Sequence, residues 1–284
     1  MKALFGPAGA SEDFYEAGYK HSYEVPAFIA GMGLTALEYQ CGRGVNIGTE
    51  AANKLGVEAK KHGVAMSVHA PYFISLASSE LEKRDKSIKY ILDSAAAAKN
   101  MGGSRIVIHP GGMGGLERRD ALREACVTLK RAVDVLDEQG LGDITVCPET
   151  MGKINQLGDL LETLSLCSVD ERLIPCLDFG HLNARTFGGV KTIDDYRAIF
   201  GEVENALGRE RASRFHCHFS KIEYSKGGEK CHLTFADNIY GPDYEPLIQL
   251  VVKENLNPVI ICESRGTQSA DAKSMADCYK GLLN

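Results

Sequence analysis

SVHAPY, at residues 67–72, ends a short apolar run in a histidine, and this arrangement recurs along the chain. Five later runs also end in a residue that can bind a metal ion: IVIHPGG (106–112), ITVCPET (144–150), IPCLDFGH (174–181), FHCHFS (215–220) and VIICES (259–264). Successive ends lie 29 to 45 residues apart, which is enough for a strand, a crossover helix and a return strand. Parallel strands with functional groups at one end are typical of a (β/α)8 barrel. The pattern therefore predicts an α/β fold, a (β/α)8 TIM barrel, as a single domain over residues 1–284.

The rest of the chain alternates between strand and helix patterns. Strands are predicted at 2–5, 36–40, 64–69, 105–109, 144–147, 173–177, 214–218 and 258–262. In 79–101, Ile88, Ile91 and Ala95 recur at the spacing of one helix face, and 119–139 repeats this periodicity. The polar stretch 224–244 is predicted as a long loop, and long loops after barrel strands usually carry function.

Composition limits the class of protein. With 44% hydrophobic and 25% charged residues, the chain is expected to be globular. No segment approaches the roughly 18 apolar residues of a membrane span, so no membrane partner is expected. Nine cysteines without paired spacing favour a cytoplasmic location. The net charge of −6 argues against a protein that passively coats DNA, but two or three bound divalent ions would add about four to six positive charges at an active face.

Histidines and carboxylates at the strand ends predict a catalytic site for several metal ions. His69 and His109 stand where proline turns the chain and leaves an imidazole at the rim. Glu149 ends a hydrophobic strand, where an unpaired carboxylate would cost several kcal/mol, and its central place in the series suits a bridge between two ions. The expected strand-end ligands are His69, His109, Glu149, Asp178, His181, His218 and Glu263, and Glu149 and Glu263 are also the expected catalytic residues.

The donor types indicate which ions and which reaction to expect. Imidazole and carboxylate ligands suit Zn²⁺, with Mn²⁺ or Fe²⁺ as alternatives, and an open site indicates catalysis. Two ions about 3.5–4 Å apart would suit phosphoester hydrolysis. His216 shares a strand face with His218 but lies deeper in the barrel, where a core or supporting role is expected.

Six ordered motifs resemble those of the endonuclease IV family of abasic-site DNA repair enzymes: HAPYF (69–73), VIHPGG (107–112), PETMG (148–152), LDFGH (177–181), HFSK (218–221) and ICES (261–264). The resemblance implies a (β/α)8 barrel with three zinc ions that cleaves DNA 5′ to an abasic site. It assigns the first ion to His69, His109 and Glu149, and the second to Glu149, Asp178, His218 and Glu263. His181 would join the third.

The third ion is where the motifs depart from the family. The family supplies an Asp-x-His pair from the long loop, but this chain has Gly-Glu-Lys-Cys-His at 228–232. Glu229 and His232 are three residues apart instead of two, and Cys231 stands at the histidine's place. Three alternatives stay open: the third site uses Cys231, uses His232, or is absent. A divergent member is therefore expected.

The resemblance also implies contacts with double-stranded DNA that carries abasic sites. In the family a tyrosine and an arginine enter the duplex at the abasic position. Tyr72 stands at the matching place in HAPY, and Gln40 and Arg43 are candidates on an earlier strand-to-helix loop, although Arg43 could equally be an ordinary solvated residue. The protein is expected to be a monomer.

Two other classes of function compete with a nuclease. A sugar isomerase or epimerase of the xylose-isomerase-like barrels would need one divalent metal, held by Glu149, Asp178, His218 and Glu263. That alternative leaves His69, His109 and His181 unexplained. A non-catalytic DNA- or sugar-binding barrel would leave the ligands without a purpose. The number of bound metals separates the first two classes: about one ion per chain favours the isomerase, and two or three favour the nuclease.

Overall fold

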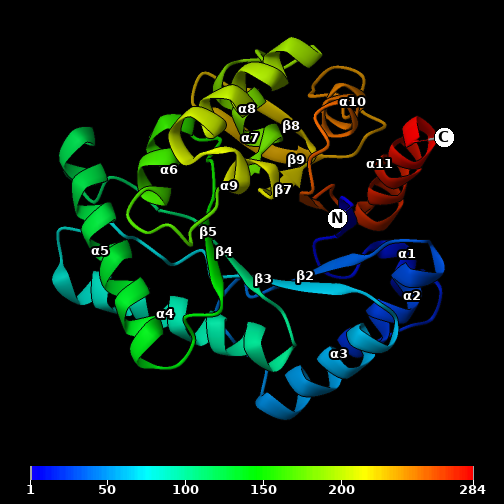
Figure 1. Cartoon of the computed structure of the whole chain (residues 1–284), viewed down its shortest axis with the longest axis horizontal. Coiled ribbons are helices and arrows are strands. Elements are labelled where there is room, and N and C mark those ends of the chain that lie inside the picture. The colour runs from blue at the N-terminus through cyan, green and yellow to red at the C-terminus, as the bar shows by residue number, and fades with distance from the viewer. Residues whose placement is uncertain (1, 284) are drawn as a thin grey trace.

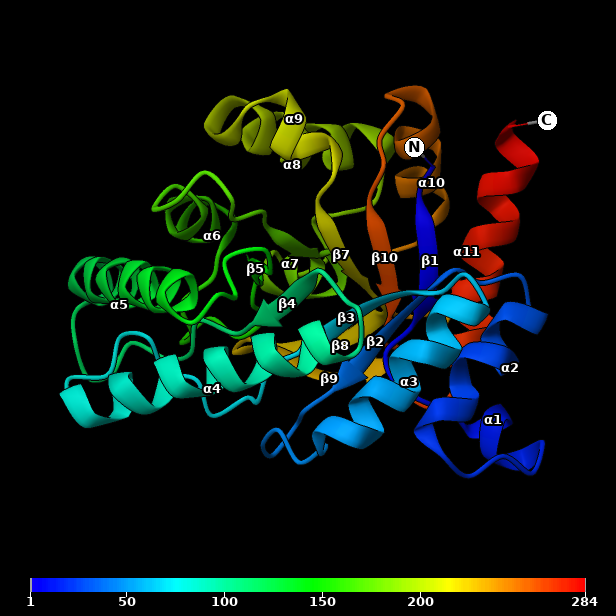
Figure 2. The same ribbon diagram turned by 60° about the horizontal axis from the view of Figure 1, so that its bottom comes forward.

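Two parallel four-stranded sheets curve around one axis in the computed structural model, which describes residues 2–283 (Figures 1 and 2). Their strand orders are β2-β3-β4-β5 and β6-β7-β10-β1. Parallel bridges from Ala8 to Glu38 and from Glu149 to Cys176 join their edges, so eight strands close the predicted (β/α)8 barrel. The strands of the barrel are β1 (Leu4–Pro7), β2 (Ala36–Gln40), β3 (Ala65–His69), β4 (Arg105–Ile108), β5 (Thr145–Pro148), β6 (Cys176–Asp178), β7 (His216–Phe219) and β10 (Val259–Cys262).

Helices cover the outside of the barrel (Figure 2). They are α1 (Glu12–Glu16), the 3₁₀ helix η1 (Ser22–Glu24), α2 (Val25–Gly31), α3 (Thr49–Lys61), α4 (Leu81–Asn100), α5 (Arg118–Glu138), α6 (Leu160–Cys167), α7 (Phe179–Arg185), α8 (Ile193–Leu207), α9 (Arg209–Ser213), α10 (Glu245–Lys253) and α11 (Gln268–Leu283). Within residues 2–283, none of them combines the length and the apolar character needed to cross a bilayer.

The helix periodicity predicted from the sequence is confirmed in α4 and α5. In α5, Ala121, Ala125, Leu129 and Leu136 form one buried face against the barrel, while charged side chains point outward. Truncating a fully buried leucine such as Leu129 to alanine would cost about 2–5 kcal/mol. These helices hold the strands in place and so fix what lies at the strand ends.

Several strand boundaries differ from the prediction by one to three residues. The strand predicted at 173–177 begins at Cys176, because Pro175 has no N–H with which to pair. The strand predicted at 214–218 is displaced in the same direction, to His216–Phe219, and His109 lies one residue beyond β4. The order and number of the barrel strands are as predicted.

The prediction of a long loop at 224–244 is wrong for its first half. An antiparallel hairpin occupies this segment, made of β8 (Lys221–Ser225) and β9 (Gly228–Leu233). Gly228 has φ +87°, a conformation that glycine adopts readily, and it lies at the tight turn between the strands. The hairpin lies across the carboxyl ends of the barrel strands and is bridged to the loop after β5 by Lys153 and Gly228.

Candidate metal centre

Six strand-end side chains converge at the carboxyl end of the barrel. Parallel pairing places Asp178 beside His218 across β6 and β7, and Ile261 beside His218 across β7 and β10. Glu263 follows β10 directly and so lies on the same rim. The predicted ligands that the structure brings together here are His69, His109, Glu149, Asp178, His218 and Glu263.

Glu149 lies at the centre of the cluster and is fully buried. Its Oε2 is 3.2 Å from Nε2 of His69 and 3.1 Å from Nε2 of His109. Its Oε1 is 3.3 Å from Nδ1 of His218 and 3.2 Å from Nδ1 of His181. Because its two oxygens face different histidines, the Glu149 carboxylate can bridge two ions, the role expected from the sequence.

Besides an overlapping group of His69, His218 and Glu263 at the same rim, the ligand atoms form three groups at the mouth of the barrel, and the atoms of each group lie within 4.8 Å of one another. The groups are His69, His109 and Glu149; Glu149, Asp178, His218 and Glu263; and His181, Glu229 and His232. The first two share Glu149. These are the three sets expected from the family resemblance, with Glu229 and His232 supplying the third.

A shift in strand pairing explains the spacing of Glu229 and His232. Tyr224 pairs with Glu229 and the preceding Glu223 pairs with Cys231, so Lys230 is an extra residue in β9. Such a bulge reverses the alternation of side chains beyond it. Glu229 and His232, three residues apart, therefore lie on one face of the hairpin.

Cys231 lies on the other side of the hairpin. Its Sγ is 3.6 Å from Oε2 of Glu223 and belongs to none of the ligand groups among residues 2–283. Nδ1 of His232 instead shares a hydrogen bond of 2.8 Å with the Ser220 hydroxyl. The centroid of the His232 ring lies 5.6 Å from that of His181. Of the three loop candidates, the geometry brings Glu229 and His232, but not Cys231, to His181.

The unsatisfied polar atoms of the cluster fit bound cations. Oε1 of Glu149, Oδ2 of Asp178 and Nδ1 of His218 are all buried without a hydrogen-bond partner. An orphaned buried polar atom costs about 1–3 kcal/mol, and more when the group is charged, so three of them facing one another need a shared partner. Divalent cations satisfy lone pairs from oxygen and nitrogen at once.

The electrostatics of the cluster point the same way. Burial alone would raise the pKa of Glu149, but the neighbouring imidazoles, led by His109, hold it well below its usual range. Burial opposes a charge on His69, but its hydrogen bond to Glu149 raises its pKa to about 9. Burial likewise opposes a charge on His181, while Asp178 and Glu149 raise its pKa to about 10. Protons thus occupy positions that metal ions could take.

Sequence reasoning missed Glu38, which lies in the middle of β2 and is fully buried. Nε2 of His218 lies 2.9 Å from its Oε1, and Ser67 donates a hydrogen bond to its Oε2. The signal was a carboxylate inside the strand Ala-Leu-Glu-Tyr-Gln, because such a group is buried only with partners. Glu38 fixes the orientation of a ligand from behind.

A pocket of about 370 Å³ opens above the cluster and is lined by residues of all three ligand groups. Gln40 and Tyr72 also line it, and half of the Tyr72 side chain is exposed. Nε of Arg43 donates a hydrogen bond to the Tyr72 hydroxyl at 3.2 Å, and the rings of Tyr72 and Phe73 lie 4.6 Å apart. The three predicted DNA-contacting residues therefore lie together at the mouth of the pocket.

Comparisons with known proteins place the chain in a family. The sequence profile of the xylose isomerase-like TIM barrel matches residues 26–281. The uncharacterized protein MJ0133 of Methanocaldococcus jannaschii is 32% identical over 98% of this chain and 97% of its own length. A probable endonuclease 4 of Chloroflexus aggregans is 28% identical over 84% of this chain and 83% of its own length. The resemblance to endonuclease IV proteins is thus confirmed as that of a divergent relative.

Solved structures agree on the fold. A D-tagatose 3-epimerase-like protein superposes with a TM-score of 0.72 at 18% identity, covering 99% of this chain and 98% of its own. Endonuclease IV from Thermus thermophilus gives a TM-score of 0.67 at 18% identity, covering 100% and 99%. At this identity the likeness shows the barrel fold alone. The relatives and neighbours carry the names of enzymes, nucleases and epimerases alike, and these names do not single out one activity.

Proposed function

This chain belongs to the xylose isomerase-like TIM barrel family, and we propose that it is a zinc-dependent endonuclease that hydrolyses the DNA phosphodiester 5′ to an abasic site. The observation that carries this proposal is the set of three ligand groups around one pocket, two of them joined by Glu149. An isomerase of this fold needs a single metal, which one group would hold. Several ions in one pocket suit a phosphodiester, whose reaction develops charge on more than one oxygen.

The donor set assigns each ion its residues. His69, His109 and Glu149 would hold the first; Glu149, Asp178, His218 and Glu263 the second; and His181, Glu229 and His232 the third. Zn²⁺ bound there, or Mn²⁺ or Fe²⁺ in its place, would supply a Lewis acid for the phosphoryl oxygens. The protein's part is to keep these donors rigid and the pocket open on one side.

Glu149 and Glu263 divide the catalytic work. Glu149 is fully buried, makes close contacts with four imidazoles and holds the cluster together. The Glu263 side chain is 15% exposed and lines the pocket, with Oε2 3.5 Å from Nδ1 of His218. A carboxylate that reaches the pocket can accept the proton of an attacking water, which a buried bridge cannot.

The rim residues would recognise the gap left by the missing base. Tyr72, steadied by Arg43, presents an exposed ring that can stack where the base is absent. Gln40 also lines the pocket and can donate to the sugar or phosphate. With a net charge of −6, the chain would bind double-stranded DNA through the metal face and a few loop contacts. The logarithm of the binding constant should therefore fall only shallowly with the logarithm of the salt concentration, with a slope of about 0.9 for each neutralised phosphate.

Incubating metal-replete protein with a duplex that carries one abasic analogue tests the proposal. We expect a single cut 5′ to the analogue and none in the matched intact duplex. The same preparation should contain two or three metal ions per chain, as the three ligand groups require. An uncut duplex, with a full complement of metal, would refute the proposal.

A sugar epimerase is the second candidate, because Glu149, Asp178, His218 and Glu263 by themselves form a complete single-metal site. In that case one ion would polarise a ketose and two carboxylates would move its proton. About one ion per chain, together with epimerisation of a ketose by a preparation that leaves the abasic duplex intact, would establish this alternative. His69, His109 and His181 would then need another explanation.

A further inference from the structure

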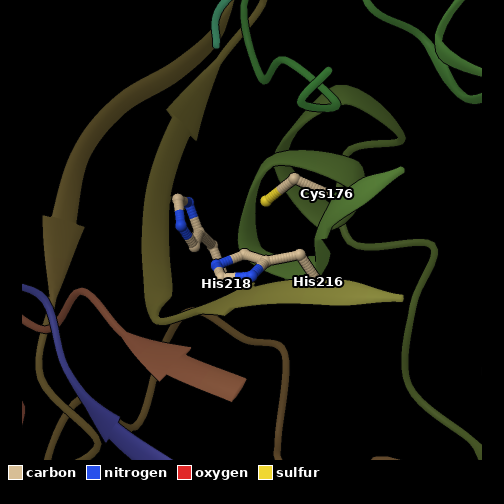
Figure 3. Close-up of side chains that lie close together, drawn as sticks. All are labelled: Cys176, His216 and His218. Atoms are coloured by element: carbon tan, nitrogen blue, oxygen red, sulfur yellow. The ribbon is translucent and has the colours of Figure 1, made fainter. Parts of the chain in front are cut away.

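A second group of side chains that could hold a metal ion lies in the barrel interior, and Figure 3 shows its three members. Cys176 of β6 and His216 and His218 of β7 each offer one ligand atom, and these atoms lie within 4.8 Å of one another. All three side chains are completely buried. Cys176 and His216 are direct partners in the pairing of β6 and β7, which holds their side chains next to each other. Of its three members, only His218 is among the strand-end ligands expected from the sequence.

His216 provides a second, independent indication. Its Nδ1 is buried without a hydrogen-bond partner, while its Nε2 lies 3.0 Å from Oε2 of Glu38. A buried imidazole normally has at least one partner, and the loss of one costs about 1–3 kcal/mol. His216 therefore has a nitrogen lone pair that is free to bind a cation.

Glu38 provides the charge that a cation would need. Its buried carboxylate lies between His216 and His218, and its oxygens are 3.0 Å and 2.9 Å from their Nε2 atoms. With Cys176 as a thiolate and Glu38 ionised, the donors carry two negative charges, which match one divalent ion.

We propose that Cys176, His216 and His218 bind one divalent ion in the barrel interior, with Glu38 as the carboxylate that balances its charge. One thiolate and two imidazoles favour a thiophilic ion such as Zn²⁺ over Mg²⁺ or Mn²⁺. The ion would connect β2, β6 and β7 from inside. The His218 ring lies between the two sites, since its Nδ1 faces Glu149 and Glu263 while its Nε2 faces Glu38. Because a neutral imidazole has only one free lone pair, filling both sites requires that His218 release its remaining ring proton to solvent and bridge the two ions as an imidazolate.

Cobalt substitution tests the interior site without an activity assay. Because the cluster is buried, the ion would enter as the chain folds, so the full-length protein should be produced in cobalt-supplemented medium. The strand-end ligands contain no thiolate. A thiolate-to-Co²⁺ charge-transfer band in the near ultraviolet would therefore report the interior site, while visible bands report the metal centre.

Three cysteine variants give the test its resolution. Cys176→Ser should abolish the charge-transfer band and lower the cobalt content by about one ion per chain. Cys147→Ser, at another buried cysteine of the barrel, and Cys231→Ser, in the hairpin, should keep the band. No band in wild type with a filled metal centre, or a band that survives Cys176→Ser, would overturn the proposal. A band lost in Cys231→Ser would do the same.

If Cys176→Ser does not fold, X-ray absorption at the cobalt edge of the Cys231→Ser protein decides the question. A sulfur neighbour at about 2.3 Å supports the interior site, since the hairpin thiol has been removed. Nitrogen and oxygen neighbours alone would refute it.

Discussion

The ligands at the barrel strand ends and those on the hairpin are held in different ways. Glu149, Asp178 and His218 are completely buried, and each comes from a strand or strand end whose neighbours on both sides belong to the closed barrel. Glu229 and His232 belong to a two-stranded sheet and are partly exposed. Strand register alone therefore fixes the positions of the first two ligand groups. The third also depends on how the hairpin docks.

Removing the shared barrel ligand should have the largest effect. In Glu149→Gln the amide cannot bridge two cations, so we expect loss of metal from the first two groups and a fall in turnover of about 10³-fold or more. Metal analysis alongside the abasic-duplex assay checks this. His216→Ala should reduce activity less than Glu149→Gln does, because His216 lies below the metal centre. Equal metal contents in wild type and Glu149→Gln would contradict the bridging role.

The hairpin ligands should be separable from the barrel ligands. In His232→Ala we expect loss of about one ion per chain and a drop in turnover of one to two orders of magnitude, because two ligand groups stay intact. Cys231→Ser is the matched control, since the Cys231 thiol faces Glu223, and its metal content should equal that of wild type. Loss of an ion in Cys231→Ser but not in His232→Ala would reverse the assignment.

Metal binding should displace protons from the barrel side of the site. The pKa values of His69 and His181 are about 9 and 10 in the metal-free protein, so both rings are protonated near pH 7. Since a ligand imidazole is neutral, apparent affinity should rise about tenfold per pH unit for each proton displaced, and level off above pH 10. Calorimetric titrations in buffers of different ionisation enthalpy measure the protons released. Zero release at pH 7 would contradict these pKa values.

The same two groups set the pH dependence of the metal-free fold. Their folded pKa values lie above the ordinary value for histidine, so they contribute stability that is fully present below about pH 6.5. That contribution is lost as the pH rises through about 9 to 10. In the metal-loaded protein both imidazoles are neutral, as they are in the unfolded chain above about pH 6.5, so metal-loaded protein should not show this alkaline loss of stability.

Docking of the hairpin can be perturbed without substituting a candidate ligand. A Cβ at Gly152 would lie 2.6 Å from Cβ of Glu229 and 2.9 Å from Cδ2 of His181, which is too close for either to stay in place. Gly152→Ala should thus weaken the third metal group about tenfold and spare the other two. Gly112→Ala is a suitable control, because nothing lies within 4 Å of its added Cβ. Metal titration distinguishes the groups, and equal losses from all three would argue against separate docking.

Tyr72 should have the smallest effect, and only on binding. Stacking of one aromatic ring contributes about 1–3 kcal/mol, so Tyr72→Ala should raise the KM for the abasic duplex about tenfold with little change in kcat. Tyr72→Phe keeps the ring but loses the hydrogen bond from Arg43, so its KM should lie between those of wild type and Tyr72→Ala. An unchanged KM in Tyr72→Ala would remove Tyr72 from the DNA contacts.

Much of the barrel and its rim could be predicted, since the relevant signals are local. A strand needs a short apolar run, and a ligand that follows it must lie at the carboxyl end. His69, His109 and Glu149 follow this rule, and the structure brings them together. The boundaries of β6 and β7 were less predictable, because they depend on pairing with strands far along the chain.

Glu38 and the hairpin could not be predicted by the same rule. Glu38 lies inside a strand, and its importance depends on His216 and His218, which are about 180 residues away in the chain. The hairpin alternates charged and apolar residues, but its bulge at Lys230 depends on which residues of β8 oppose those of β9. Local periodicity predicts neither the contacts of Glu38 nor the pairing of β8 with β9.

The extra residue in β9 bears on how relatives of this protein are recognised. An alignment that tolerates no gap sets Cys231 against the family histidine and concludes that a ligand has been replaced. In the structure, β9 accommodates the extra residue as a bulge, and His232 lies at the inward-facing position. We therefore expect that such a motif can gain one residue and still bind a metal ion, provided that the strand can bulge. Searches for similar enzymes should match the inward face of the hairpin, allowing two or three steps between acid and histidine.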